Sequence, residues 1–454
     1  MSRPQSQAEY LARMVPTSVR AVDLSRRSLM RGALGASALV GGSAALSACG
    51  GDDASTTGGA DGEAASGEVT LGSNRSDPVP GDALAAVVES FQDANSGVTV
   101  ATNTVDNESF QENINNYLQG QPDDVFTWFS GFRMRFFAER GLAGDISDVW
   151  EDMPGMSDAL KEASTGDDDK QYLVPSTYYP WAVFFRPSVF AERGYTPPTT
   201  LDEMVALGGQ MKTDGLIPIA FGDKDGWPAM GTFDQLNLRI NGYDFHVNLM
   251  AGDEAWDGPE VKQVFDTWRG LLELHQPDSL GRSWQEAAQS LQQKQSGMYV
   301  LGMFVGQQFE EGADRDDLDF FNFPEIDSNI GSDAIEAPID GFMMAQRPRN
   351  EAGAKALLAY LGTAEAQNIS VAADPTVIAT NSDAETSGYT ALQNKAVEFV
   401  ASAASIAQFM DRDTRPDFAS TVMIPAIQEF IGNPNDVDSL VRSIEEQKQS
   451  IFAS

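Results

Sequence analysis

The residues that most often carry out chemistry in proteins are scarce in this sequence. His246 and His275 are the only histidines and Cys49 is the only cysteine. Neither histidine has the spacing of a metal ligand. The sequence has no nucleophile elbow, phosphate-binding loop or Cys/His pair. We therefore expect no catalytic residue, no metal and no cofactor.

Aromatic and hydrogen-bonding side chains offer a different chemistry, the binding of a ring with apolar faces and a rim of hydroxyls. Trp128 ends an apolar run, and ligands of open parallel sheets bind beyond the carboxyl ends of strands, although the alternation also permits a core position. Asp225 and Trp227 share a Gly-rich turn, where a large ring has no regular face to bury. Arg415 could donate its planar fork to hydroxyls or pair with a neighbouring Asp.

The first 48 residues are typical of an export segment and are excluded from the fold. Residues 25–31 match the twin-arginine pattern, with paired Arg after Ser followed by an apolar pair and a base, which directs export of folded proteins. The apolar stretch 32–46 is shorter than the roughly 20 residues that cross a bilayer. We expect no permanent transmembrane helix.

The next segment indicates a lipid anchor. Leu46-Ser47-Ala48-Cys49 resembles the lipobox of bacterial lipoproteins, which implies lipidation of Cys49 and attachment to the outer face of the cell membrane. Residues 50–67 contain no large apolar side chain and cannot offset the entropy of ordering, so 49–67 should be a flexible tether.

Size and charge limit the partners. The chain has a net charge of -37, and loss of residues 1–48, with six Arg and two acids, would take it to -41. Nucleic acid is therefore excluded as a partner, and the acidic surface favours a soluble monomer. About 400 remaining residues are enough for two domains with separate cores.

From Glu68 onward, short apolar strands alternate with amphipathic helices, which predicts an α/β fold. Asp82 is the expected cap of a first helix, and the run 125–129 a buried strand. The helical spacing around Trp268 places it in a core. Trp150 and Trp256 are also expected in the core, whereas Trp284 fits either a core or a ligand role.

Several segments, taken in order, resemble the family 1 extracellular solute-binding proteins, the sugar receptors of ABC importers that include maltose-binding protein. The resemblance spans residues 68–454. Its motifs include the following: Pro122-Asp123-Asp124-Val125-Phe126, Tyr172-Leu173-Val174-Pro175, Phe184-Phe185-Arg186-Pro187, Gly222-Asp223-Lys224-Asp225-Gly226-Trp227-Pro228, Gly297-Met298-Tyr299-Val300 and Ala337-Pro338-Ile339-Asp340-Gly341.

The resemblance implies a two-lobed periplasmic-binding-protein-like fold of type II, with three chain crossings as the hinge and the ligand cleft between the lobes. The first lobe would take residues 68–181 and 297–340. The second lobe would take residues 182–296 and 341–454.

The resemblance also implies further cleft residues. Tyr179 and Trp181 would lie at the first crossing, and Asp340 and Gly341 at another, where Gly permits close approach and the carboxylate can accept hydroxyl hydrogen bonds. Phe304 stands where many relatives place Trp. Asn74 and Arg75 would follow the first strand in a loop that faces the cleft, although solvated loop positions fit them as well.

The function implied is capture of a mono- or oligosaccharide by hinge closure, followed by delivery to membrane permease subunits. Two alternatives stay open. One is a secreted carbohydrate-active hydrolase, because two carboxylates at the separation used by glycosidases could meet by chance among so many. The other is a receptor that senses a solute without transporting it.

Overall fold

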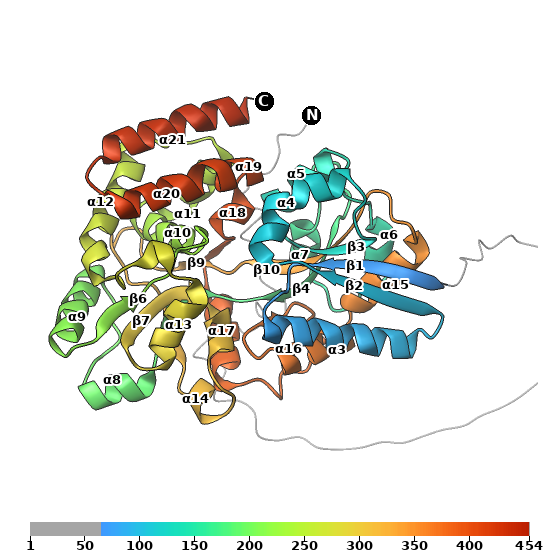
Figure 1. The fold of residues 1–454 in the computed structure, drawn as a ribbon, viewed down its shortest axis with the longest axis horizontal. Helices are drawn as coiled ribbons and strands as arrows, with labels where there is room; N and C mark the ends of the chain where they lie inside the picture. Colours follow the sequence, from blue (N-terminus) through green and yellow to red (C-terminus); the bar gives the residue numbers. More distant parts are fainter. Residues whose placement is uncertain (1–64, 454) are drawn as a thin grey trace, which may run out of the picture.

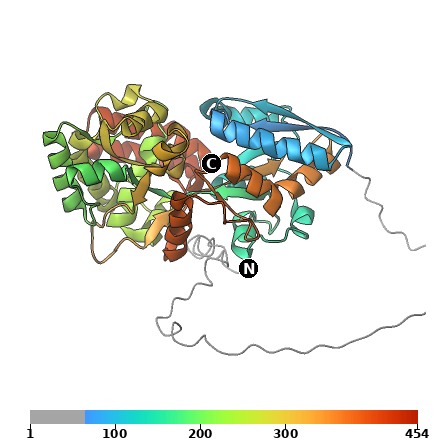
Figure 2. The ribbon, with the colours of Figure 1, turned by 90° about the horizontal axis from the view of Figure 1, so that it is seen from below.

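A computed structural model describes residues 65–453, which form two α/β lobes lying side by side (Figure 1). Each lobe is built on one six-stranded sheet. Seen at right angles, the lobes are distinct bodies joined by a few segments of chain (Figure 2). The expected export segment 1–48, Cys49 and nearly all of the expected tether 49–67 lie outside the described residues; Gly67 already begins the first strand.

The first sheet has the strand order β11-β4-β10-β3-β1-β2. The strands β1, β2 and β3 are parallel, whereas β10 and β11 run antiparallel to their neighbours. The strand bounds are β1 (Gly67–Ser73), β2 (Val98–Thr104), β3 (Val125–Phe129), β4 (Leu173–Tyr178), β10 (Ile339–Met344) and β11 (Ile378–Ala379).

Helices cover both faces of the first sheet (Figure 1). Along β3, Val125 packs into the core shared with one helical layer, and Phe126 and Trp128 pack into a separate cluster with the other layer. This is the period-two alternation of a strand buried on both faces. The helices are α3 (Pro78–Ala94), α4 (Asn107–Gln119), α5 (Phe132–Glu139), α6 (Ser147–Trp150), α7 (Asp158–Ala163), α15 (Glu351–Leu361) and α16 (Ala364–Ala373).

The second sheet has the order β12-β9-β5-β7-β6, with β8 paired to β5. Its strands are β5 (Trp181–Phe185), β6 (Ile217–Ala220), β7 (Ser296–Gly302), β8 (Asp319–Phe321), β9 (Ala334–Glu336) and β12 (Ser405–Ala407). The remaining helical segments are α8 (Pro187–Arg193), α9 (Leu201–Thr213), α10 (Pro228–Ile240), α11 (Gly242–Ala251), α12 (Pro259–Leu271), η1 (Leu272–Leu274), η2 (Ser279–Gly281), α13 (Trp284–Gln292), η3 (Met303–Gln308), α14 (Ala313–Asp316), α17 (Ala391–Ser402), α18 (Met410–Asp413), α19 (Pro416–Phe418), η4 (Ala419–Met423), α20 (Ile424–Gly432) and α21 (Val437–Phe452).

The chain passes between the two sheets three times, as the resemblance implies. The strand β4 of the first sheet leads into β5 of the second through Tyr179 and Pro180. The strand β9 leads back to β10 through Ala337 and Pro338. The last passage lies between β11 and β12.

The expected division of the carboxyl-terminal half between the lobes is wrong. Residues 297–340 were expected in the first lobe, but β7, β8 and β9 pair within the second sheet. The strands β10 and β11 pair in the first sheet, although residues 341–454 were expected in the second lobe. All of these strands are short and apolar, and such a pattern does not say which sheet a strand joins.

The first helix begins earlier than expected. Asp77 occupies the N-cap and Pro78 the first turn, so Asp82 lies inside α3 and is not its cap. Proline is well suited to that position because its missing N–H would be unpaired there in any case. Among the described residues, every helix is too short or too polar to cross a membrane.

Candidate ligand-binding cleft

A cavity of about 200 Å³ lies between the lobes and is walled by residues from both. The first lobe contributes the loop after β1, the start of α4, and parts of β3 and β10. The second lobe contributes the start of β5, the turn before α10, and residues of α13, η3 and α18. The predicted site residues that line the cavity are Asn74, Arg75, Trp128, Tyr179, Trp181, Trp227, Phe304, Asp340 and Gly341.

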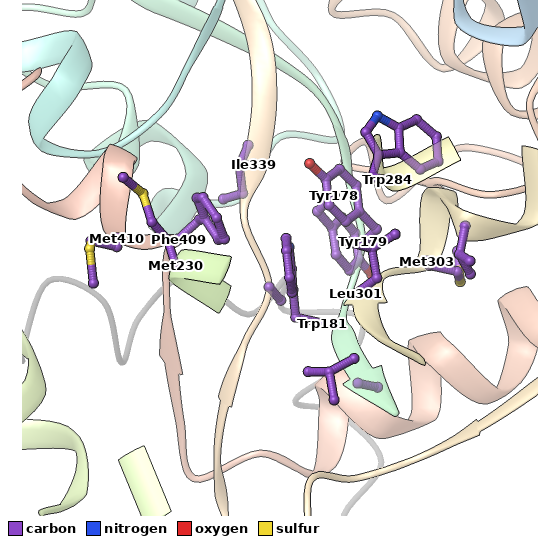
Figure 3. Close-up of a cluster of buried hydrophobic side chains, with 14 of the residues drawn as sticks. Tyr178, Tyr179, Trp181, Met230, Trp284, Leu301, Met303, Ile339, Phe409 and Met410 are labelled. Atoms are coloured by element: carbon purple, nitrogen blue, oxygen red, sulfur yellow. The ribbon is translucent and has the colours of Figure 1, made fainter. Parts of the chain in front are cut away.

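Aromatic rings from separate segments gather at one wall of the cavity. Trp181 stacks on Phe409, with ring centroids 4.7 Å apart and planes at 26°. Figure 3 shows Trp181 between Phe409 on one side and Tyr179 on the other, with Trp284 beyond. The ring of Phe304 lies 6.2 Å from that of Trp181 and 5.1 Å from that of Trp284. Such flat apolar surfaces match the C–H faces of a sugar ring.

The local backbone explains the position of Trp181. It is the first residue of β5 and pairs with Gly302 of β7 and Glu336 of β9. Its six-membered ring packs on Gly231 of α10, where an added Cβ would lie 2.1 Å from the ring. Only 2% of the residue is exposed. Trp181 therefore forms a fixed floor of the cavity, and Gly231 permits the close approach.

Charged groups line another wall. The Nη1 atom of Arg412 lies 2.8 Å from Oδ1 of Asp340, and its Nη2 donates a hydrogen bond of 3.0 Å to the hydroxyl of Tyr179. Burial alone would lower the pKa of Arg412, but the neighbouring Tyr179 and Asp340 outweigh burial and raise that pKa. The guanidinium is therefore a fixed cation that orients the Asp340 carboxylate, which can still accept hydrogen bonds from a ligand.

Two further charged residues, Arg75 and Asp374, also line the cavity. Arg75 donates from Nη2 to Oγ of Ser176 at 3.2 Å. Asp374 accepts a hydrogen bond of 3.1 Å from Nε2 of Gln307, which belongs to the other lobe. Burial raises the pKa of Asp374 and lowers the pKa of Arg75. These groups add hydrogen-bond donors and acceptors to the lining of the cavity.

Hydrogen bonds across the cleft link the lobes around the cavity. Trp227 donates from Nε1 to Oε1 of Glu108 on α4 at 3.2 Å. Arg133 of α5 pairs with Asp411 of α18 at 2.9 Å. Gln285 of the second lobe also donates from Nε2 to the carboxylate of Asp77 in the first lobe, at 3.4 Å. In this structure the two lobes are therefore in direct contact around the cavity.

The turn that carries Trp227 is anchored by Asp223. Its Oδ1 accepts a hydrogen bond of 2.9 Å from the backbone of Ala229, and its carbonyl accepts one of 2.9 Å from Gln428. Gly226 has φ +80°, and a Cβ there would lie 2.2 Å from Ile424. Pro228 then starts α10. These contacts leave Trp227 one defined position facing the other lobe.

Asp223 should make stability depend on pH. Burial raises the pKa of this carboxyl from 3.8 to about 7. The folded state therefore keeps a proton that the unfolded chain releases, and stability falls as pH rises from about 4 to about 7. We expect Asp223→Asn, which keeps the acceptor for Ala229, to be more stable than the wild type at pH 8 by on the order of 1 kcal/mol or more, with the difference shrinking towards pH 4. Thermal melts across this pH range measure it.

The control for this prediction is Asp253→Asn, a change at an exposed carboxyl in the same lobe. That variant should show the same pH profile as the wild type. A stability difference between Asp223→Asn and wild type that stayed constant from pH 4 to pH 8 would contradict the role assigned to burial.

Two of the predicted residues do not line the cavity, and a third, Trp128, lines it mainly as a core residue. Trp128 is 1% exposed and packs with Phe110 and Phe137, so it is mainly a core residue, the alternative that the strand pattern allowed. Asp225 lines a smaller neighbouring pocket and not the cavity. Arg415 does not line the cavity, and its guanidinium pairs with Asp417 at 2.8 Å, which is the alternative of an ion pair with a neighbouring Asp. The physical reason is local, because the carboxylate of Asp417 lies only two residues further along the chain.

The sequence-based prediction missed several residues of the cavity wall. Arg412 lies in the same acidic segment as Arg415, and the helical turn of α18 is what aims it at Asp340. Trp284, which had been compatible with either role, lines the cavity. The other residues that were missed include Asp77, Asn107, Glu108, Gln111, Gln285, Gln307, Asp374, Phe409 and Asp411.

The fold and the cleft define a two-lobed binding protein with its site at the lobe interface. A family model for bacterial extracellular solute-binding proteins matches residues 76–368, and the chain belongs to that family. The family consists of solute receptors and not of enzymes.

Among solved structures, this chain is similar to the bacterial solute receptor AcbH, with 43% identity and a TM-score of 0.83; the match covers 85% of this chain and 99% of that one. A chitin oligosaccharide binding protein matches with 20% identity and a TM-score of 0.77, over 86% of this chain and 100% of that one, which shows the fold alone.

Other relatives match a smaller part of this chain. An uncharacterized ABC transporter extracellular-binding protein of Pyrococcus horikoshii is 24% identical over 55% of this chain. A probable sugar-binding periplasmic protein of Mesorhizobium japonicum is 24% identical over 44% of this chain. The chain spans about half the length of these relatives, 57% and 49% respectively.

Proposed function

We propose that this protein is the carbohydrate receptor of an ABC importer and that it closes its two lobes around one small sugar. The observation that carries the proposal is the convergence of Trp181 and Phe409 with the ion pair of Asp340 and Arg412 on one cavity. Aromatic faces and charged hydrogen-bonding groups are the two features that a sugar site needs.

The relatives support the same ligand class. The receptor AcbH, with 43% identity, is reported to have an exclusive substrate preference for β-D-galactopyranose. The volume of about 200 Å³ is below the roughly 300–1,000 Å³ of pockets for drug-sized ligands, so it suits a single ring. Galactose is therefore the first ligand to test.

Hinge closure supplies the mechanism. The three chain segments between the sheets let the lobes rotate, and a sugar that contacts both lobes favours the closed arrangement. The closed receptor would then dock on the permease. In this proposal no covalent bond is made or broken, and the protein acts as a monomer without a cofactor.

The proposed location follows from the amino-terminal sequence. The twin-arginine pattern and the lipobox support export of the folded chain and lipidation of Cys49, which would hold the receptor at the outer face of the membrane near its permease. The low-complexity residues between Cys49 and the start of β1 at Gly67 would act as the tether.

A thermal-shift panel of mono-, di- and trisaccharides tests the function. A ligand at 100 times its dissociation constant stabilises the native state by about 2.7 kcal/mol, so a selective rise in Tm is expected for one monosaccharide. Incubation of the same sugars with the protein should leave them uncleaved. If no carbohydrate raised Tm, the receptor proposal would be wrong, and release of shorter sugars would instead favour a hydrolase.

A further inference from the structure

We infer that Trp227 and Glu108 form a partition across the cleft that limits the ligand to one sugar ring. The inference rests on the proposed function and extends it to the residues that decide ligand length. Its basis is a second pocket of about 50 Å³ directly beside the main cavity.

The two pockets share one wall. Glu108, Gln111, Trp227 and Asp411 line both of them. The hydrogen bond from Nε1 of Trp227 to Oε1 of Glu108 spans the lobes at this shared wall, at 3.2 Å. A ligand that extended from the main cavity into the second pocket would have to displace this pair of side chains.

Glu108 is held in place by a chain of side-chain hydrogen bonds. Asn107 donates to its Oε1 at 3.2 Å and accepts at Oδ1 from Asn74 at 2.9 Å. Thr127 of β3 donates to Asn74 at 2.8 Å, and Gln111 donates to Asn107 at 3.2 Å. The network connects the partition to the sheet, and the carboxylate cannot turn aside without losing its hydrogen bonds from Asn107 and Trp227.

Trp227 is equally constrained. Its ring makes aromatic contacts with Phe304 at 6.0 Å, with Phe409 at 6.3 Å and with Trp181 at 6.5 Å. The turn below it is fixed by Asp223 and by Gly226. The indole is therefore part of the aromatic wall on one side and the end stop of the cavity on the other.

The test compares the affinity for the best monosaccharide with that for disaccharides containing it, by calorimetry. Wild type should bind the monosaccharide more tightly. Trp227→Ala should weaken monosaccharide binding and, because it joins the two pockets, change the ratio of the two affinities by about tenfold or more in favour of a disaccharide. Glu108→Ala should shift the ratio in the same direction. This second variant still tests the partition if Trp227→Ala does not fold.

Asn113→Ala is the matched control, since Asn113 lies on the same helix, is exposed and donates a hydrogen bond to the backbone carbonyl of Ser109. It should leave the ratio unchanged. Two outcomes would overturn the partition: wild type binding a disaccharide as tightly as the monosaccharide, or unchanged ratios in both variants. Absence of any sugar binding by wild type would instead refute the proposed function itself.

Discussion

Trp181→Ala is expected to weaken sugar binding roughly 100-fold, because it removes the floor of the cavity and the partner on which Phe409 stacks. The same change should lower the free energy of unfolding by about 3–5 kcal/mol, since a nearly fully buried ring is lost. Calorimetric titration measures the affinity, and urea denaturation measures the stability. Trp181→Phe, which keeps a ring, should lose less of both.

The matched control for this change is Trp268→Ala, which truncates a fully buried tryptophan of the same lobe outside the cavity. That variant should lose stability to a similar extent while the folded protein keeps its affinity. If Trp181→Ala bound sugar as tightly as wild type, the aromatic wall would not be the sugar-binding surface.

The second large effect is expected for Asp340→Ala. The change removes a hydrogen-bond acceptor from the cavity and takes from the buried guanidinium of Arg412 its nearer carboxylate, leaving Asp411 at 3.9 Å as its ion-pair partner. A hydrogen bond to a charged group contributes about 1.5–3 kcal/mol, so affinity should fall roughly 10- to 100-fold. Stability should fall by about 1–3 kcal/mol, because one partner of a largely buried pair is lost.

Asp417→Ala provides the comparison for Asp340→Ala. It also removes a carboxylate from an arginine pair, that of Arg415, but this pair lies outside the cavity and is more exposed. The expected change is about 0–1 kcal/mol in stability and none in affinity. Equal effects of the two substitutions on sugar binding would contradict the place given to Asp340.

Local signals in the sequence predicted the part of the site that depends on a single segment. The Gly-rich turn around Trp227 has no face on which to bury an indole, and the structure places that ring at the cavity. The ordered motifs of the family likewise placed Tyr179, Trp181 and Asp340 at the crossings, where they line the cavity.

The contacts that were missed join segments far apart in the sequence. Glu108 lies 119 positions from Trp227, and nothing in the spacing around either residue indicates the other. Arg412 reaches Asp340 while Arg415, three residues later, pairs locally, and only the turn of α18 decides between them. For the same reason, strand pairing in residues 297–379 could not be read from short apolar runs.

The sugar identified by the ligand panel can be located directly by a crystal structure of the complex. We predict one sugar ring between the lobes, against Trp181, with hydroxyls within hydrogen-bond distance of Asp340 or Arg412. A sugar bound on the outer surface of either lobe, with the cleft left empty, would contradict the account.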